Sequence, residues 1–333
     1  MKVAIIGSNL PDSLEHNLQE AFTYRKDSCQ IFDIVSTTTH NNKYLFNIDK
    51  LLRNFSNKYD LNVFKKLAER VAYFKPDLVI GVYRFIHPIF ITTFKKLHKS
   101  PIIQLNPDAL TTFEYQQVFA SEYDAWFTKD PYIVRFMRNN MHLNAIYYNE
   151  AFNKRLHRKP EMEKAQAEKE VGIDVMTYGT IYPYRANMLK QVIKAGLQLK
   201  IYGSAPHRFY DHTLDGCFQN RYIVGEEKAK LLYGAKIVFN QMHYAEIESV
   251  NNRFFEANGC GAFQISDYRP ILNDILPIDP EKVSFKSIDD AIDKMKYYLV
   301  HPQERYEIAQ TIYKHFVNKY SYDELINYIL SKI

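Results

Sequence analysis

The first half of the chain alternates short apolar runs with stretches in which hydrophobic residues recur every three or four positions. The apolar runs predict buried strands, and the amphipathic stretches predict helices, the first of them capped by Ser13. The predicted strands are 3–7, 29–35, 77–82, 101–106 and 125–128, and the predicted helices are 13–22, 63–74, 88–98 and one containing Arg135. This alternation is typical of a doubly wound α/β domain, in which helices cover both faces of a parallel sheet.

The second half repeats the alternation without repeating the sequence. Its predicted strands are 173–178, 199–203, 237–240 and 262–266, and its predicted helices are 288–299, 303–317 and 322–329. Segment 153–171 has almost no β-branched or aromatic residues, so we place the linker there.

The pattern therefore predicts an α/β fold with two Rossmann-like, doubly wound domains that face a central cleft. We expect the first domain at 1–160, the second at 161–316, and a final helix at 317–333. The final helix has the length and the apolar spacing either to cross back to the first domain or to complete the second.

Composition narrows the class of protein. Of the 333 residues, 46% are hydrophobic and 24% are charged, which is typical of soluble globular proteins and excludes disordered or fibrous classes. The chain begins with a strand pattern rather than a signal peptide, and no apolar run has membrane-spanning length, so we expect a cytoplasmic protein. The three cysteines are widely spaced and lack the spacing of a disulfide framework or a zinc site.

The positive charge is concentrated in the first half. Residues 1–165 hold 23 Lys and Arg against 17 Asp and Glu, whereas residues 166–333 hold 20 against 21. Such basic clusters can dock on phosphorylated acceptors or on anionic lipids, which would place the protein peripherally at the inner face of the membrane; a solvated helix surface is the alternative. The bias is too weak for a nucleic-acid-binding protein, and no module of that kind is recognisable.

Loops that follow strands are where doubly wound folds bind ligands. The G-x-G-x-x-G fingerprint and the P-loop motif are both missing, which disfavours dehydrogenases and P-loop enzymes. After the strand at 173–178, Gly179 and Thr180 lead into a helix whose first turn carries Arg185. A close backbone approach, a hydroxyl and a positive charge at a helix N-terminus suit a diphosphate, although a plain turn with a surface arginine has the same pattern.

Segment 246–262 gathers polar residues just before an apolar strand. Glu248 and Glu256 can face one cleft if a loop carrying the first leads into a helix carrying the second. A carboxylate accepts two hydroxyl hydrogen bonds at once, as a ribose or sugar diol requires. Asn251 and Asn252 stand where that helix should begin, so its free N–H groups and Arg253 could hold phosphate oxygens. The alternative is an amphipathic helix with solvated charges.

The stretch from Glu248 to Gly261, with seven residues between its two glutamates and a following strand, resembles the donor-site signature of GT-B glycosyltransferases. The resemblance is to the group-1-type carboxyl-terminal domain of CgeB-like proteins, and it extends over about residues 175–268. It implies that Glu256 binds the ribose hydroxyls of a nucleotide-sugar and that Glu248 approaches the donor sugar or its phosphates.

Further site residues follow from the same resemblance. Arg185 and Arg253 would neutralise the diphosphate, and Arg208 is a candidate substitute for the lysine that the family usually has near Gly203. The other implied donor-binding residues are Gly179, Thr180, Gly203, Ser204, Gly225, Asn251 and Asn252.

The resemblance also implies a reaction. The chain would move a sugar from a nucleotide-sugar to a glycan or glycolipid acceptor with retention of configuration, and Glu248 and Arg253 would contribute to catalysis. No Asp-x-Asp motif of the metal-dependent transferases occurs, so no metal or other cofactor is expected. Inversion would instead require a general base from the first domain, with Asp12, His16 and Asp108 as candidates. A nucleotide-sugar 2-epimerase and a non-catalytic, partner-binding subunit are the alternative functions.

Overall fold

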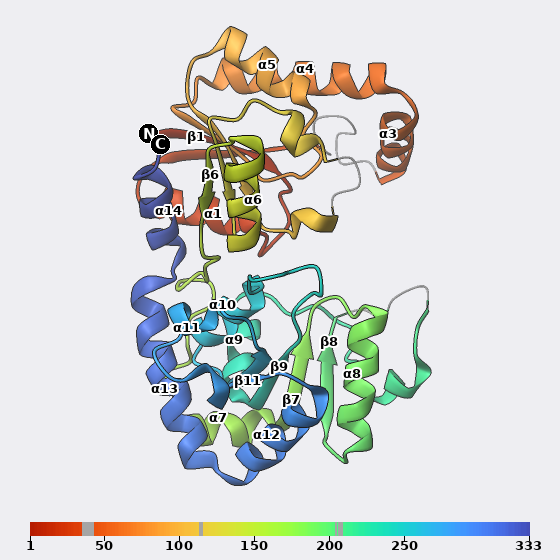
Figure 1. Ribbon diagram of the computed structural model, residues 1–333, viewed down its shortest axis with the longest axis vertical. Coiled ribbons are helices and arrows are strands. Elements are labelled where there is room, and N and C mark those ends of the chain that lie inside the picture. The colour runs from red at the N-terminus through yellow and green to blue at the C-terminus, as the bar shows by residue number, and fades with distance from the viewer. Residues whose placement is uncertain (35–42, 113–115, 204, 206–208) are drawn as a thin grey trace. The chain divides into compact units, whose positions relative to one another are not determined.

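The chain forms two compact units in a computed structural model, which describes residues 1–34, 43–112, 116–203, 205 and 209–333 (Figure 1). The first unit consists of Met1–Asn149 together with Tyr322–Ile333, and the second consists of Glu150–Ser321. The end of the chain therefore belongs to the same unit as its beginning. From the sequence, boundaries are expected after residues 160 and 316.

The first unit is built on a parallel six-stranded sheet with the order β2-β1-β3-β4-β5-β6. Its strands are β1 (Lys2–Gly7), β2 (Ser28–Asp33), β3 (Leu78–Gly81), β4 (Ile102–Asn106), β5 (Ala125–Thr128) and β6 (Ala145–Tyr147). The five predicted strands are confirmed, although the predicted end of the second one at Val35 lies outside the described residues. The three-residue strand β6 is too short to give a sequence pattern of its own.

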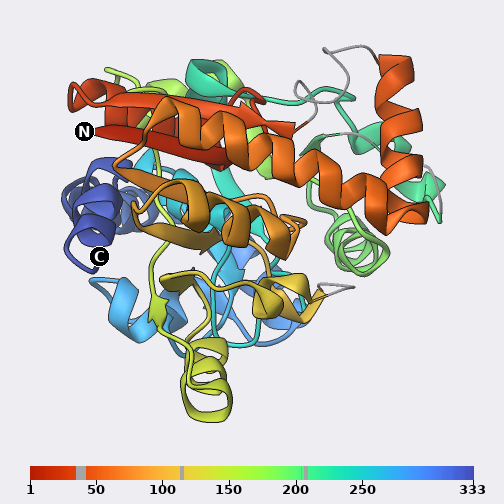
Figure 2. The same cartoon turned by 90° about the horizontal axis from the view of Figure 1, so that it is seen from above.

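The helices of this unit are α1 (Leu14–Tyr24), α3 (Lys43–Phe55), α4 (Asn57–Phe74), α5 (Pro88–Leu97), α6 (Pro131–Met141) and α14 (Tyr322–Leu330), with short 3₁₀ turns at Leu110–Thr112 and Gln117–Ala120. The Ser13 side chain accepts a hydrogen bond from the backbone N–H of His16, which confirms the predicted cap. Helices α4 and α5 lie side by side (Figure 2), and α14 packs against α1. Among the described residues, no helix is both long enough and apolar enough to cross a bilayer.

The second unit has a parallel five-stranded sheet with the order β11-β10-β9-β7-β8. Its strands are β7 (Ile173–Tyr178), β8 (Leu199–Tyr202), β9 (Ala235–Asn240), β10 (Gln264–Asp267) and β11 (Ser284–Phe285). Apolar side chains from the middle strands fill both faces of the sheet: Val175 and Ile237 belong to one buried cluster, and Met176 and Val238 belong to another. Burial on both faces explains why these strands appear as continuous apolar runs.

The helices of the second unit are α7 (Lys164–Val171), α8 (Pro183–Lys194), α9 (Gly225–Gly234), α10 (Asn252–Gly259), α11 (Leu272–Ile275), α12 (Ile288–Val300) and α13 (Pro302–Lys319), with 3₁₀ turns at His212–Cys217 and Pro280–Lys282. Helix α7 occupies part of the predicted linker and packs against α9. The interpretation of that part as a linker was wrong, because a charged segment without β-branched residues is also what a short surface helix looks like.

Candidate functional site

The order of the strands in the second sheet defines where a ligand would bind. The chain passes from β7 to β8 on one side and later places β9 on the other side of β7. The loops that follow β7 and β9 therefore diverge at the carboxyl edge of the sheet, and doubly wound folds bind ligands at such a point. The first loop spans 179–182 and leads to α8, and the second spans 241–251 and leads to α10.

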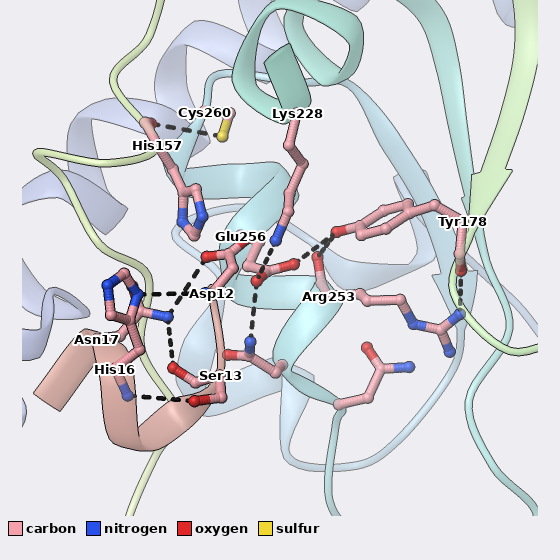
Figure 3. A network of polar contacts seen from close by, with 12 residues as sticks. Asp12, Ser13, His16, Asn17, His157, Tyr178, Lys228, Arg253, Glu256 and Cys260 are labelled. Carbon is pink, nitrogen blue, oxygen red and sulfur yellow. Dashed lines mark hydrogen bonds and ion pairs between the residues drawn. The ribbon is translucent and has the colours of Figure 1, made fainter. Parts of the chain in front are cut away.

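The guanidinium of Arg253 bridges the ends of these two strands, and Figure 3 shows its contact with Tyr178. Its Nη1 donates to the carbonyl of Tyr178 over 2.7 Å, and its Nη2 donates to the carbonyl of Gln241 over 2.8 Å. Arg253 lies in the first turn of α10, where the Asn251 side chain caps the helix by accepting from the N–H of Phe254. A full positive charge and the positive end of a helix dipole are thus combined at one point, which favours an anion.

Glu256 lies one turn further along α10 and is only 4% exposed. Its Oε1 accepts from Nζ of Lys228 at 2.9 Å and from Nδ2 of Asn252 at 3.1 Å, and its Oε2 accepts from the hydroxyl of Tyr178 at 3.1 Å (Figure 3). Burial is the main cause, and the negative charge of Glu256 the second, of a pKa for Tyr178 that lies well above its ordinary value. The Tyr178 hydroxyl therefore stays protonated and donates its hydrogen bond. A carboxylate has about four acceptor positions, so Glu256 keeps the capacity for one more hydrogen bond.

Arg185 is 1% exposed rather than a surface residue. Its Nε donates to Oε1 of Gln241 at 3.0 Å, its Nη2 donates to Oγ1 of Thr177 at 2.9 Å, and its Nη1 donates to the carbonyl of Thr180. Burial, followed by the nearby charge of Arg253, lowers its pKa well below the usual value; arginine in proteins nonetheless stays protonated at neutral pH. In this arrangement Arg185 holds the turn after β7 in place, and its predicted contact with a diphosphate stays a prediction.

Gly179 and Gly203 let the ends of β7 and β8 approach closely. Gly179 has a φ of 89° and Gly203 has a φ of 143°, values that side chains rarely allow. A Cβ on Gly203 would lie 2.6 Å from the carbonyl oxygen of Gly179. The two glycines therefore let the backbones at the ends of β7 and β8 pack closely together, and the predicted close approach of a ligand to Gly179 and Thr180 stays a prediction.

The remaining predicted site residues are distributed around the same edge. Thr180 is exposed, and Gly225 begins α9 with a φ of 54°. Glu248 is half-buried in the loop before α10, and the predicted succession of loop and helix between Glu248 and Glu256 is confirmed. Ser204 lies outside the described residues, as does Arg208. The role of each of these residues stays a prediction.

Three functional candidates were missed from the sequence: Lys228, Tyr178 and Gln241. Lys228 is 6% exposed and lies on the buried face of α9 with Ala229 and Leu232. A buried lysine requires an acidic partner, so a lysine among the apolar positions of this helix is the signal in the sequence that could have identified it. Gln241 is fully buried, and its Nε2 has no hydrogen-bond partner among the described residues. A donor at the edge of the sheet therefore remains available to a ligand or a water molecule.

An aromatic cluster borders this edge. It consists of Tyr182, Tyr184, His243 and Tyr244, from the loops and the helix that follow β7 and β9. The rings of His243 and Tyr244 stack with centroids 4.4 Å apart, and the Tyr184 ring meets the rings of both. Tyr244 is 76% exposed.

The three candidate bases of the first unit follow strands of its own sheet. Asp12 and His16 come after β1, and the backbone N–H of Asp12 donates to Nδ1 of His16 at 3.2 Å. Asp108 follows β4, is half exposed and lies 3.9 Å from Arg84. Glu15, which precedes His16 in α1, is buried and accepts a hydrogen bond from the backbone N–H of Ser8 at 2.8 Å. Burial raises the pKa of the Glu15 carboxyl group.

Comparisons with known proteins agree with this geometry. Residues 185–331 match the family model described as "Glycosyl transferase-like". Spore protein CgeB of Bacillus subtilis (strain 168) is 23% identical over 233 residues, which cover 60% of this chain and 71% of CgeB. Sucrose-phosphate synthase from Thermosynechococcus elongatus is similar in structure with a TM-score of 0.70 at 12% identity, covering 99% of this chain and 98% of that one.

A further solved structure, Anabaena HepE in complex with UDP-glucose, is similar with a TM-score of 0.68 at 12% identity, and the similarity covers 100% of both chains. Likeness over the whole chain confirms the predicted fold, with two parallel sheets in two Rossmann-like units. The sequence relationship to CgeB and to the glycosyl transferase-like family confirms the predicted resemblance. The chain therefore has the two-domain fold of GT-B glycosyltransferases, and it is similar in sequence to the glycosyl transferase-like family and to CgeB.

Proposed function

We propose that this chain transfers a sugar from a nucleoside diphosphate sugar to a glycan or glycolipid acceptor, and that the donor binds at the carboxyl edge of the second sheet. The observation that carries the proposal is the position of Arg253, whose guanidinium is fixed across the ends of β7 and β9 at the N-terminus of α10. The complex of HepE with UDP-glucose, a protein of the same fold, supports a nucleotide-sugar as the donor.

The donor diphosphate would lie against Arg253 and the first turn of α10, with Asn252 and the turn at Gly179 and Thr180 close by. Charge builds up on the diphosphate as the glycosidic bond breaks, and fixed donors stabilise it without reorganising. The buried guanidinium of Arg185, which binds the carbonyl of Thr180, would add its positive charge to that of Arg253. We propose retention of configuration, with Glu248 close to the donor sugar.

Glu256 would accept a hydrogen bond from a ribose hydroxyl at its remaining acceptor position. Its carboxylate is already oriented by Lys228 and Tyr178, so binding requires little further ordering of the side chain. The aromatic cluster would lie against the apolar face of a sugar ring, since the exposed ring of Tyr244 offers a flat, weakly polar surface.

We expect the double variant Lys228→Met/Glu256→Gln to bind UDP and UDP-glucose about tenfold more weakly than the wild type, because it loses the charge-assisted hydrogen bond between the Glu256 carboxylate and the ribose. Isothermal titration calorimetry measures the affinity. Removing both partners avoids an unpaired buried charge, so the variant should stay folded.

The matched control is Glu168→Gln/Arg305→Met. That pair is also buried in the second unit, with 2.6 Å between Nη2 of Arg305 and Oε2 of Glu168, but it involves α7 and α13. The control should bind UDP normally. Equal affinity of the wild type and the Lys228→Met/Glu256→Gln variant would reject the proposed ribose contact.

We also propose that transfer needs no bound metal, because Arg253 and the helix N-terminus supply positive charge where the leaving group would lie. Enzyme treated with EDTA and then freed of it should release UDP from UDP-glucose in the presence of acceptor at the untreated rate. Activity that disappears and returns with Mg²⁺ or Mn²⁺ would contradict this. Turnover of the sugar nucleotide without any acceptor would instead favour an epimerase.

A further inference from the structure

Helix α3 (Lys43–Phe55) of the first unit turns its apolar face outward. Five large hydrophobic side chains of this helix are between 42% and 84% exposed: Leu45, Ile48, Leu51, Leu52 and Phe55. At 100° per residue, their positions fall within an arc of about 120° on one side of the helix. A surface helix ordinarily directs such a stripe toward the core.

The side of α3 away from the exposed stripe carries a buried, paired carboxylate. Asp49 is 3% exposed and forms a salt bridge with Arg53 at 2.7 Å. The hydroxyl of Tyr59, from α4, donates to Asp49 at 3.0 Å. Charged and hydroxyl groups thus contribute to the attachment of α3 to α4.

The segment that carries α3 is strongly basic. Residues 43–99 hold twelve Lys and Arg against four Asp and Glu, so they supply more than the whole excess positive charge of the chain. On α4, which packs against α3, the side chains of Lys58, Lys65, Lys66 and Arg70 are exposed, with one acidic side chain, Glu69, exposed among them. Figure 2 shows α3 next to the N-terminal end of α4.

The apolar stripe of α3 and the basic side chains of α4 together indicate the chemistry of a binding partner. Apolar side chains need a layer from which water is excluded, and the lysines need anionic groups close to that layer. A bilayer with anionic headgroups offers both within the depth of one helix, and amphipathic helices that lie in the interface have this composition. The charge distribution therefore favours a lipid surface over a second copy of this chain, which would bring two basic segments together.

We propose that α3 is a membrane-docking helix that inserts its apolar face into an anionic lipid surface, with the basic side chains of α4 binding the headgroups. The inference goes beyond the transfer reaction and does not depend on it. Docking would hold the enzyme at the surface where glycolipid acceptors are found.

The test is co-sedimentation of the full chain with vesicles. The wild type should bind vesicles of equal parts phosphatidylglycerol and phosphatidylcholine, and should bind pure phosphatidylcholine at least tenfold more weakly. Ile48→Gln/Phe55→Gln should weaken binding to the anionic vesicles about tenfold or more, because the replaced side chains no longer gain from burial. Both residues are exposed, so the variant should keep the circular dichroism spectrum and melting temperature of the wild type.

The charge contribution is tested separately. Lys65→Glu/Lys66→Glu should also weaken binding at least tenfold, since each cation near an anionic surface contributes about 1 kcal/mol, or roughly fivefold. Raising the salt from about 0.1 M to about 1 M shortens the Debye length from about 10 Å to about 3 Å and should have a similar effect on the wild type.

Two matched controls should bind like the wild type. Val300→Gln/Ile333→Gln replaces exposed apolar side chains elsewhere, and Lys282→Glu/Lys314→Glu makes the same change in charge on the second unit. Wild-type protein that fails to sediment with anionic vesicles, or an α3 variant that binds as well as the wild type, would overturn the proposal. A wild-type dimer that the α3 variant converts to a monomer, without vesicle binding by either, would assign the face to self-association instead.

Discussion

Replacing Lys228 with methionine should lower the free energy of unfolding of the second unit by about 3 kcal/mol, because it leaves the carboxylate of Glu256 buried without its counter-charge. Nζ of Lys228 and Oε1 of Glu256 are 2.9 Å apart, and both side chains are less than 10% exposed. Tyr178 and Asn252 still donate to the carboxylate, so the loss should fall at the lower end of the range for broken buried pairs.

Urea unfolding followed by far-UV circular dichroism measures this loss. Trp126, the one tryptophan of the chain, is buried in the first unit, so its fluorescence reports separately on that unit. The transition seen by fluorescence should move little if the destabilisation is confined to the second unit. The double variant Lys228→Met/Glu256→Gln should recover most of the lost stability, since it removes both charges. A single variant as stable as the wild type would show that Lys228 does not neutralise a buried charge.

Replacing Gly203 with alanine should destabilise the second unit by roughly 3 kcal/mol, from backbone strain and from overpacking together. The φ of 143° is unfavourable for any residue with a side chain, and the new Cβ would meet the carbonyl oxygen of Gly179 at 2.6 Å. That oxygen belongs to the backbone at the end of β7 and cannot move without disturbing the sheet. The same denaturation experiment measures the effect.

Gly196→Ala separates the two contributions. Gly196 also has a positive φ, of 82°, but nothing lies within 4 Å of a Cβ placed there. Its substitution should cost about 1 kcal/mol, from backbone strain alone. Equal destabilisation by Gly196→Ala and Gly203→Ala would mean that the contact between β7 and β8 accommodates a methyl group.

The local part of the candidate site could be predicted from the sequence. Asn251, Arg253 and Glu256 lie within six consecutive positions, so a correctly placed helix start already determines which way they project. The predicted helix start at Asn251 and Asn252 and the loop before it both agree with the structure. Periodicity and turn residues carry this information because they act over a few residues.

The non-local part could not be predicted in the same way. Lys228 is 28 positions from its partner Glu256, and only the packing of α9 near α10 brings them together. Arg185 stands in the first turn of a helix, where arginine is ordinarily exposed, and its burial depends on acceptors from β7 and from the end of β9. The apolar residues of α3 recur at helical spacing, so the helix itself could have been predicted; the exposure of its apolar face could not, because exposure depends on how the helix is attached.

The burial of Arg185 has a consequence for how the protein responds to its ionic environment. Mobile ions weaken interactions between charges that solvent reaches, and they have much less effect on a charge inside the protein. The guanidinium of Arg185 is 1% exposed, so the positive potential that it contributes at the end of β7 should persist in concentrated salt. The exposed lysines of α4 lose their influence under the same conditions. Salt should therefore release the protein from an anionic surface well before it weakens the attraction of the sheet edge for a phosphate.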